Sequence, residues 1–291
     1  MPIFGIDRES VEGRATNVCC AFGNAGVVPL IFLEALFRNR EKDILQKAFS
    51  QVSMYLLGWS PLFWSFGRNA LLGNQIGNMT ENDEEADVDI ISSWRSRLQP
   101  MFPPPVVGVC VGIILASLPL LRALVMSSID TPDSKAPFEV VFNCCQNLGR
   151  AANPVALLVL TSSLALGNSN VKQQHEHCQE GEIPIPLLKR WSCVSIARFI
   201  LSPALMIALL QSLHKCGVIG SMKSSDSMIW FVLILEASMP CAQNSVLMLQ
   251  VAEKPSEASR LARFLFTMYA TSMVPVVIVS TILLEKCNFM V

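Results

Sequence analysis

The stretch around which this sequence is organised reads Leu235-Glu236-Ala237-Ser238-Met239-Pro240-Cys241-Ala242-Gln243-Asn244-Ser245-Val246-Leu247-Met248-Leu249-Gln250. It lies in an apolar run, residues 228–251, that is long enough to cross a bilayer. The central proline removes a backbone N–H and clashes with the carbonyl four residues earlier. A helix broken in this way, with amides at the break, can form a small-molecule site at mid-membrane. The alternative is a plain proline kink in a packed helix.

The composition indicates a polytopic membrane protein. The chain has 291 residues, of which 52% are hydrophobic and 15% are charged, whereas soluble domains carry about 25% charged residues. The net charge of −1 predicts no nucleic-acid partner. The ten cysteines form no C-x-x-C pair and are typical of buried small hydrophobic residues, not of a zinc site or disulfide framework.

Seven apolar runs of spanning length follow one another along the chain. They are residues 16–37, 44–66, 105–126, 137–166, 187–213, 228–251 and 261–284. Backbone groups in lipid must be paired within each segment, which favours helices. The expected fold class is therefore all-α, a polytopic membrane protein with about seven transmembrane helices.

The first run contains an interruption that resembles the one in the sixth. It reads Phe22-Gly23-Asn24-Ala25-Gly26-Val27-Val28-Pro29, so two glycines and a proline flank an amide at mid-span. Each interrupted run is followed by a short charged link and an unbroken run. Paired interruptions in two halves are the best sequence indication of a transporter site.

Two polar loops separate these runs. Residues 67–104 hold an acidic cluster, 81–87, and lead into Pro103-Pro104-Pro105, which is typical of a mobile linker, with a regulatory loop as the alternative. Residues 168–186 contain His175-Glu176-His177-Cys178, but no second cluster completes a metal site, so no metal is expected. Lys and Arg are more frequent on the N-terminal side of the spans, which places the long loop in the cytoplasm.

Two arginines lie deep inside apolar runs. Arg150 belongs to a further glycine–proline element, Gly149 to Pro154, which predicts a third interruption, and Arg198 lies halfway along the fifth run. Charges at such depth usually face a cavity or a partner, so either could attract an anion. The structural alternative for Arg198 is pairing with Glu236 or with the free carbonyls of a broken helix.

These motifs together resemble the auxin efflux carrier family, in particular its PIN-LIKES branch. The similarity is greatest in Ala237-Ser238-Met239-Pro240-x-Ala242-x-Asn244 and extends to Gly23-Asn24-x-Gly26 with Pro29, Leu148-Gly149 with Pro154, and Arg198-Phe199 with Pro203. The chain departs from the family pattern at Val27, where relatives often carry a second asparagine, and at Arg150 and Asn153.

The resemblance implies an inverted-repeat transporter with two broken, crossing helices in a ten-helix fold. On that template the chain lacks the first three helices. Residues 1–66 are the remainder of the N-terminal repeat, with helices 16–37 and 44–66. Residues 67–104 are the cytoplasmic acidic, proline-rich loop, and residues 105–291 are the C-terminal five-helix repeat.

The function that the resemblance implies is secondary transport of a small organic anion of the indole-3-acetic acid type, by efflux or by intracellular sequestration. The carboxylate is expected at Asn24, Gly26, Gln243 and Asn244, near half-helix ends at Pro29 and Pro240, with Arg198 as a further ligand. The apolar ring is expected against Gly149 and Pro154.

No nucleophile, metal set or cofactor loop is found, so neither an enzyme nor a cofactor is expected. The expected partners are the organic anion and the lipid bilayer, and a homodimer is one compatible assembly. The resemblance implies a multi-pass protein of the endoplasmic reticulum or plasma membrane. Two alternatives stay open: a non-transporting remnant or regulatory partner of a full-length carrier, and a seven-helix receptor.

Overall fold

The described part of the chain is built from helices. The computed structural model describes residues 6–7, 10–38, 42–73, 104–125, 136–174, 185–224, 226–287 and 289, and of the side chains at 42, 150, 152, 153, 156 and 166–174 nothing is described. The acidic cluster, the link at 39–41, the His175–Cys178 segment and the Arg150 side chain therefore lie outside the described residues. In these ranges the one β-type pairing is an isolated bridge between Gly23 and Cys241.

Each of the seven apolar runs contains helix. In chain order the helices are α1 (Val11–Ala21), α2 (Val27–Phe37), α3 (Lys42–Leu62), α4 (Arg68–Leu72), α6 (Pro104–Ser117), α7 (Pro119–Val125), α8 (Glu139–Gln174), α9 (Leu187–Ile196), α10 (Ser202–Lys215), α11 (Ser227–Ala237), α12 (Asn244–Val251) and α13 (Pro255–Lys286). Single π-helical turns, Phe63–Gly67 and Ala197–Leu201, join α3 to α4 and α9 to α10.

The first and sixth runs are interrupted where the sequence predicts. Between α1 and α2 the chain leaves helical geometry at Phe22, which is extended, and resumes it after Gly26. Between α11 and α12 it leaves the helix at Ser238 and resumes it at Asn244. The freed backbone groups of these two segments must then find partners outside their own helices.

One other expectation is wrong, and one run bends where no bend was predicted. Pro154 does not interrupt the fourth run, since it lies inside α8, which is 36 residues long. One proline removes a single N–H donor, and neighbouring turns can carry the helix on. The third run is not one straight helix, since α6 and α7 meet at a bend of 103°. Pro119 follows this bend, and a proline pushes the residue before it, Leu118, out of helical geometry.

Within the residues that the structure describes, two helical segments are long and apolar enough to cross a membrane by themselves. They are Leu187–Lys215, which comprises α9 and α10, and Pro255–Lys286, which is α13; the bent pair α6–α7 would be a third if it is one span. The helices α2 and α11 are apolar but shorter, because each is half of an interrupted run. The count of seven spans and the two-repeat plan stay predictions.

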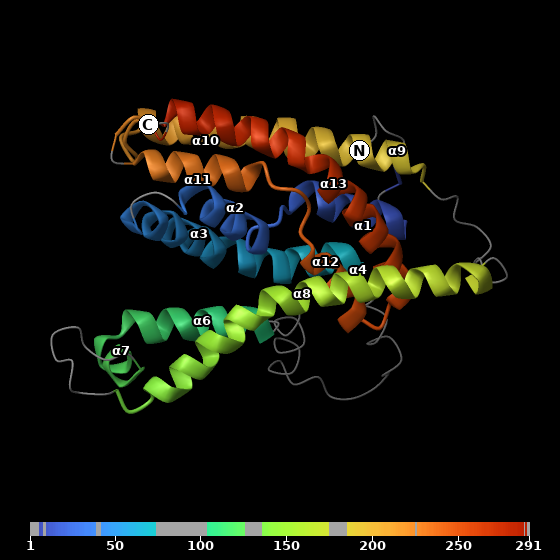
Figure 1. Cartoon of the computed structure of the whole chain (residues 1–291), viewed down its shortest axis with the longest axis horizontal. Helices are drawn as coiled ribbons and strands as arrows, with labels where there is room; N and C mark the ends of the chain where they lie inside the picture. Colours follow the sequence, from blue (N-terminus) through green and yellow to red (C-terminus); the bar gives the residue numbers. More distant parts are fainter. Residues whose placement is uncertain are drawn as a thin grey trace, which may run out of the picture.

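The broken helices lie in the interior of the helix assembly (Figure 1). The α11 helix packs against α3 and α10, and α12 packs against α13 and α8, while α8 crosses the side opposite α10. One buried cluster gathers around Phe63, Phe264 and Met268, and a second around Phe37 and Phe231. The two breaks lie between these clusters, since Cys241 belongs to the first and Met239 to the second.

Candidate functional site

The two interrupted segments pair with each other. The backbone N–H of Asn24 donates to the Pro240 carbonyl at 2.6 Å, and the backbone N–H of Ala242 donates to the Phe22 carbonyl at 3.1 Å. Gly23 and Cys241 form an antiparallel bridge between these bonds. Each break thus supplies hydrogen-bond partners for the other, which is what unwound backbone in an apolar interior requires. We call the paired segments, residues 22–26 and 238–243, the crossing.

A glycine allows the close approach at the crossing. A Cβ on Gly23 would collide with the Arg198 guanidinium and would lie 3.3 Å from the Met239 carbonyl oxygen. A side chain larger than hydrogen therefore cannot occupy this position without displacing Arg198. Gly26, in contrast, has open space where a Cβ would be.

Arg198 binds the end of the broken helix α11. It is only 3% exposed. Its Nε donates to the Met239 carbonyl at 3.0 Å, one terminal nitrogen donates to the Glu236 carbonyl at 3.4 Å, and the other donates to the Ser202 hydroxyl at 3.4 Å. These contacts are the structural alternative, in which Arg198 pairs with the free carbonyls of a broken helix. Arg198 is not among the residues that line the cavity beside the crossing.

The phenol of Tyr269 on α13 joins both segments of the crossing. Its hydroxyl accepts a hydrogen bond from the Asn24 side-chain amide at 2.6 Å and donates one to the Cys241 carbonyl at 2.8 Å. The other end of the Asn24 side chain, Oδ1, accepts from the Gly26 amide N at 3.3 Å. Asn24, which is buried, is thereby held in one orientation.

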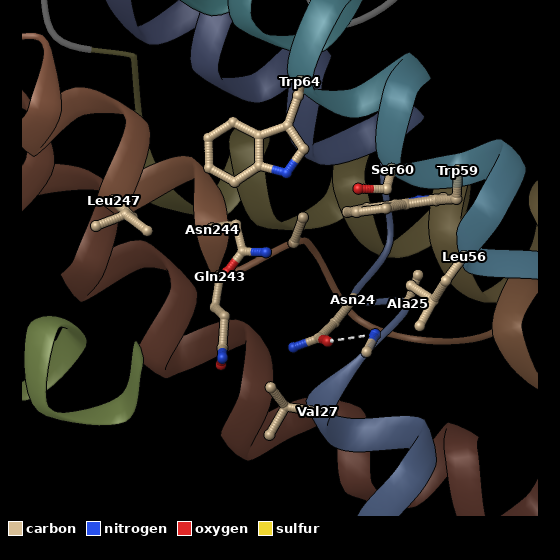
Figure 2. A pocket seen from close by; sticks show the side chains of 12 residues that line it. Asn24, Ala25, Val27, Leu56, Trp59, Ser60, Trp64, Gln243, Asn244 and Leu247 are labelled. Carbon is tan, nitrogen blue, oxygen red and sulfur yellow. Dashed lines mark hydrogen bonds between the residues drawn. The ribbon is translucent and has the colours of Figure 1, made fainter. Parts of the chain in front are cut away.

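A cavity of about 270 Å³ lies beside the crossing (Figure 2). Amides and small side chains of both breaks form one wall, and side chains of the second apolar run form the other. The lining residues are Asn24, Ala25, Gly26, Val27, Leu56, Trp59, Ser60, Trp64, Ala242, Gln243, Asn244 and Leu247. The cavity therefore combines hydrogen-bonding groups on one side with two indole rings on the other.

Two helix N-termini meet at this cavity. Gly26 precedes α2 and Gln243 precedes α12, and neither helix start has a side-chain cap. The first backbone N–H groups of a helix lack partners within it and carry partial positive charge. Gln243 adds a free donor, because it is 6% exposed and its Nε2 has no hydrogen-bond partner among the described residues. The polar wall is suited to an anionic group.

The aromatic wall comes from α3 and the π-helical turn that follows it. Trp59 stacks on Phe63 with ring centroids 4.6 Å apart, and Phe22 packs edge-on against both rings. Trp64 is five residues further on, and such residues do not share a face of a straight α-helix. A π-helical turn, which is wider than an α-helical turn, begins at Phe63, between Trp59 and Trp64 in the chain.

The structure brings four of the predicted site residues together at the cavity: Asn24, Gly26, Gln243 and Asn244. Pro240 lies in the crossing, and Pro29 is buried in the first turn of α2. Gly149 and Pro154 are exposed on α8 and do not line the cavity, so the expected ring contact on that helix is not formed.

Sequence reasoning missed the two tryptophans, Ser60 and Tyr269. The available signal was the pair of indoles around Ser60-Pro61 in the second run. Tyr269 lies in an unbroken apolar run without a motif, so only its contacts show its role.

Comparison with known proteins identifies the family of the chain. Residues 3–280 match the model of a family described as "Membrane transport protein". The chain is 22% identical over 256 residues to Protein PIN-LIKES 1 of Arabidopsis thaliana, covering 78% of this chain and 49% of that protein. It is 22% identical over 285 residues to Protein PIN-LIKES 4 of the same plant, covering 78% of this chain and 64% of that protein.

The chain thus spans between half and two thirds of the length of these relatives. No solved structure matches it. The family match covers both interrupted helices and both walls of the cavity. The chain belongs to the membrane transport protein family, which is the auxin efflux carrier family.

Proposed function

We propose that this protein is a secondary transporter, or the substrate-binding part of one, for a small organic anion with a planar aromatic group. Indole-3-acetic acid is the reference substrate of this class. The observation that carries the proposal is the cavity beside the crossing, with a polar wall from both breaks and an indole wall from the second run. Family membership supports transport, and the names of the plant relatives alone do not define the substrate.

The carboxylate of the substrate binds the polar wall. The uncapped N-termini of α2 and α12 supply partial positive charge, which stabilises an anion by roughly 0.3–1 kcal/mol per helix end, and by more where the site is buried. The Gln243 amide supplies the hydrogen-bond donor that has no partner in the described structure. Asn24 is already engaged by Tyr269, so it positions the backbone more than it binds the anion.

The ring of the substrate binds between Trp59, Trp64 and Leu247. Flat aromatic faces favour stacked or edge-on contact with another ring, by about 0.5–1.5 kcal/mol beyond the area buried. A cavity of about 270 Å³ is slightly smaller than typical ligand sites, which run from roughly 300 to 1,000 Å³. These dimensions favour a substrate of one or two fused rings.

Transport requires the site to open to either side of the membrane in turn. In this proposal the crossing and the helices joined to it move as a unit past the remaining helices, by an elevator-like or rocking shift. The crossing is held by hydrogen bonds from α13 and from the turn between α9 and α10, so these elements move with it.

Binding of radiolabelled indole-3-acetic acid to the purified protein tests this site, followed by uptake into proteoliposomes. Replacing Gln243 with leucine should weaken binding by about tenfold or more, because a charge-assisted hydrogen bond contributes roughly 1.5–3 kcal/mol. Asn244→Ala should also weaken it. Asn147→Ala, an amide exposed on α8, is the matched control and should bind like the parent. Equal affinity in all four proteins would refute the assignment of the cavity.

A further inference from the structure

The crossing contains a buried carboxyl group that the proposed anion site does not use. Glu236 lies in the last turn of α11, directly before the break, and is 1% exposed. Neither Oε1 nor Oε2 has a hydrogen-bond partner among the residues that the structure describes. A buried carboxylate would normally accept several hydrogen bonds, so this side chain is an exception that requires an explanation.

The nearest ionisable groups come from two elements. Arg198, on the π-helical turn after α9, and Tyr55, on α3, both interact electrostatically with Glu236. The Arg198 guanidinium donates to the main-chain carbonyl of Glu236, as well as to that of Met239, and not to the Glu236 side chain. Among the side chains that the structure describes, the remaining ionisable ones on the helices that pack against α11 are Asp43 and Lys47 on α3, His214 and Lys215 on α10, and Glu257, Arg260, Arg263, Tyr269, Glu285 and Lys286 on α13.

The unpartnered oxygens indicate the protonation state in this conformation. Placing an ionised carboxylate in an apolar interior without hydrogen bonds is far more costly than placing a neutral acid there. The residues close to Glu236 along the chain include Leu235 and Met239, whose side chains are fully buried and carry no hydrogen-bond donor. The arrangement is therefore compatible with the neutral acid and unfavourable for the anion.

We propose that Glu236 binds and releases a proton during transport, so that the protein carries the organic anion together with a proton. This inference rests on the proposed function and adds the coupled ion. It follows from the position of an unpartnered carboxyl beside the same backbone carbonyls that Arg198 holds at the crossing.

The link between proton and substrate runs through Arg198. When Glu236 loses its proton to bulk water, the O–H bond breaks and the new negative charge attracts the guanidinium. Arg198 then leaves the carbonyls of Met239 and Glu236, and the crossing loses the donors that hold its α11 side. The anion cavity is built on the crossing, so the anion binds more tightly to the protonated form.

The test is the affinity for labelled indole-3-acetate between about pH 6 and about pH 9, a range in which the ligand itself stays ionised. In the parent protein we expect the dissociation constant to rise with pH, by up to about tenfold per pH unit. Glu236→Gln, a neutral mimic of the protonated acid, should bind with no pH dependence, and Glu236→Met serves if that variant does not fold. Glu34→Gln, an exposed carboxyl on α2, is the matched control and should behave like the parent. The proposal would be overturned if the dissociation constant of the parent protein did not change with pH, or if that of Glu236→Gln did.

A second measurement needs no organic anion. The infrared carbonyl band of a protonated carboxylic acid should be present in the detergent-solubilised parent protein, should disappear as the pH rises, and should be missing in Glu236→Gln or Glu236→Met. If indole-3-acetate binds to none of the proteins but this band behaves as expected, the proposed substrate fails and the proton site stands. If the band is the same in the parent and the variants, the proton site is refuted whatever the substrate.

Discussion

Replacing Gly23 with alanine should disrupt the crossing. An added Cβ would collide with the Arg198 guanidinium and lie 2.8 Å from its central carbon. Arg198 is almost fully buried, so it can avoid the methyl group only by leaving the carbonyls of Met239 and Glu236. Hydrogen bonds from charged groups contribute about 1.5–3 kcal/mol each, so losing both costs about 3–6 kcal/mol.

The assay is thermal unfolding of the detergent-solubilised protein, together with binding of indole-3-acetate. With roughly 2–4 °C per kcal/mol for a chain of this order of size, the melting temperature should fall by on the order of 10 °C. Binding should weaken in parallel, because the polar wall of the cavity is part of the same crossing.

Gly58→Ala is the matched control for this substitution. Gly58 lies on an exposed face of α3, and a Cβ there meets nothing within 4 Å. Alanine is a better helix former than glycine by about 1 kcal/mol, so this variant should be as stable as the parent or slightly more stable. If Gly23→Ala melts at the same temperature as Gly58→Ala, the contact between Arg198 and the crossing does not stabilise the fold, and the reasoning is wrong.

Three further predictions concern the groups around the crossing. Tyr269→Phe removes a hydroxyl that bonds both segments of the crossing, so it should lower the melting temperature and weaken anion binding; an unchanged melting curve would contradict this. Trp59→Ala should weaken binding of indole-3-acetate by about tenfold and leave any binding of acetate unchanged. An equal loss for both ligands would refute the proposed contact between Trp59 and the substrate ring. Mild oxidation should join Cys20 and Cys193, whose sulfurs are 3.9 Å apart, and should leave transport intact if α1 and α9 move as one body; loss of transport, restored by a reductant, would show that they move apart.

The sequence contains local signals for the two breaks. Pro240, with the polar residues around it, and the glycines at 23 and 26 each disfavour continuous helix within their own run. These effects depend on residues that are close along the chain, so the interruptions at 22–26 and 238–243 can be predicted from the sequence. The same local reasoning fails for Pro154, because neighbouring turns of α8 carry the helix past one missing N–H.

The composition also indicates the class of protein. An average charge content of 15% and a succession of apolar runs are sufficient to predict helices in a membrane. The amides that line the cavity, Asn24, Gln243 and Asn244, could be selected from the sequence since they lie at the breaks.

Only the tertiary structure decides which groups meet. Gly23 and Cys241 are more than two hundred positions apart and still form a backbone bridge, because each break needs hydrogen-bond partners that its own helix cannot provide. At the crossing Arg198 binds the end of α11 and Tyr269 bonds to both segments, while Trp59 and Trp64 line the same cavity as the amides. The sequence by itself determined where the first and sixth runs break, whereas the packing of distant segments decided what each of these two breaks faces, since the stabilising contacts there join residues that no local pattern connects.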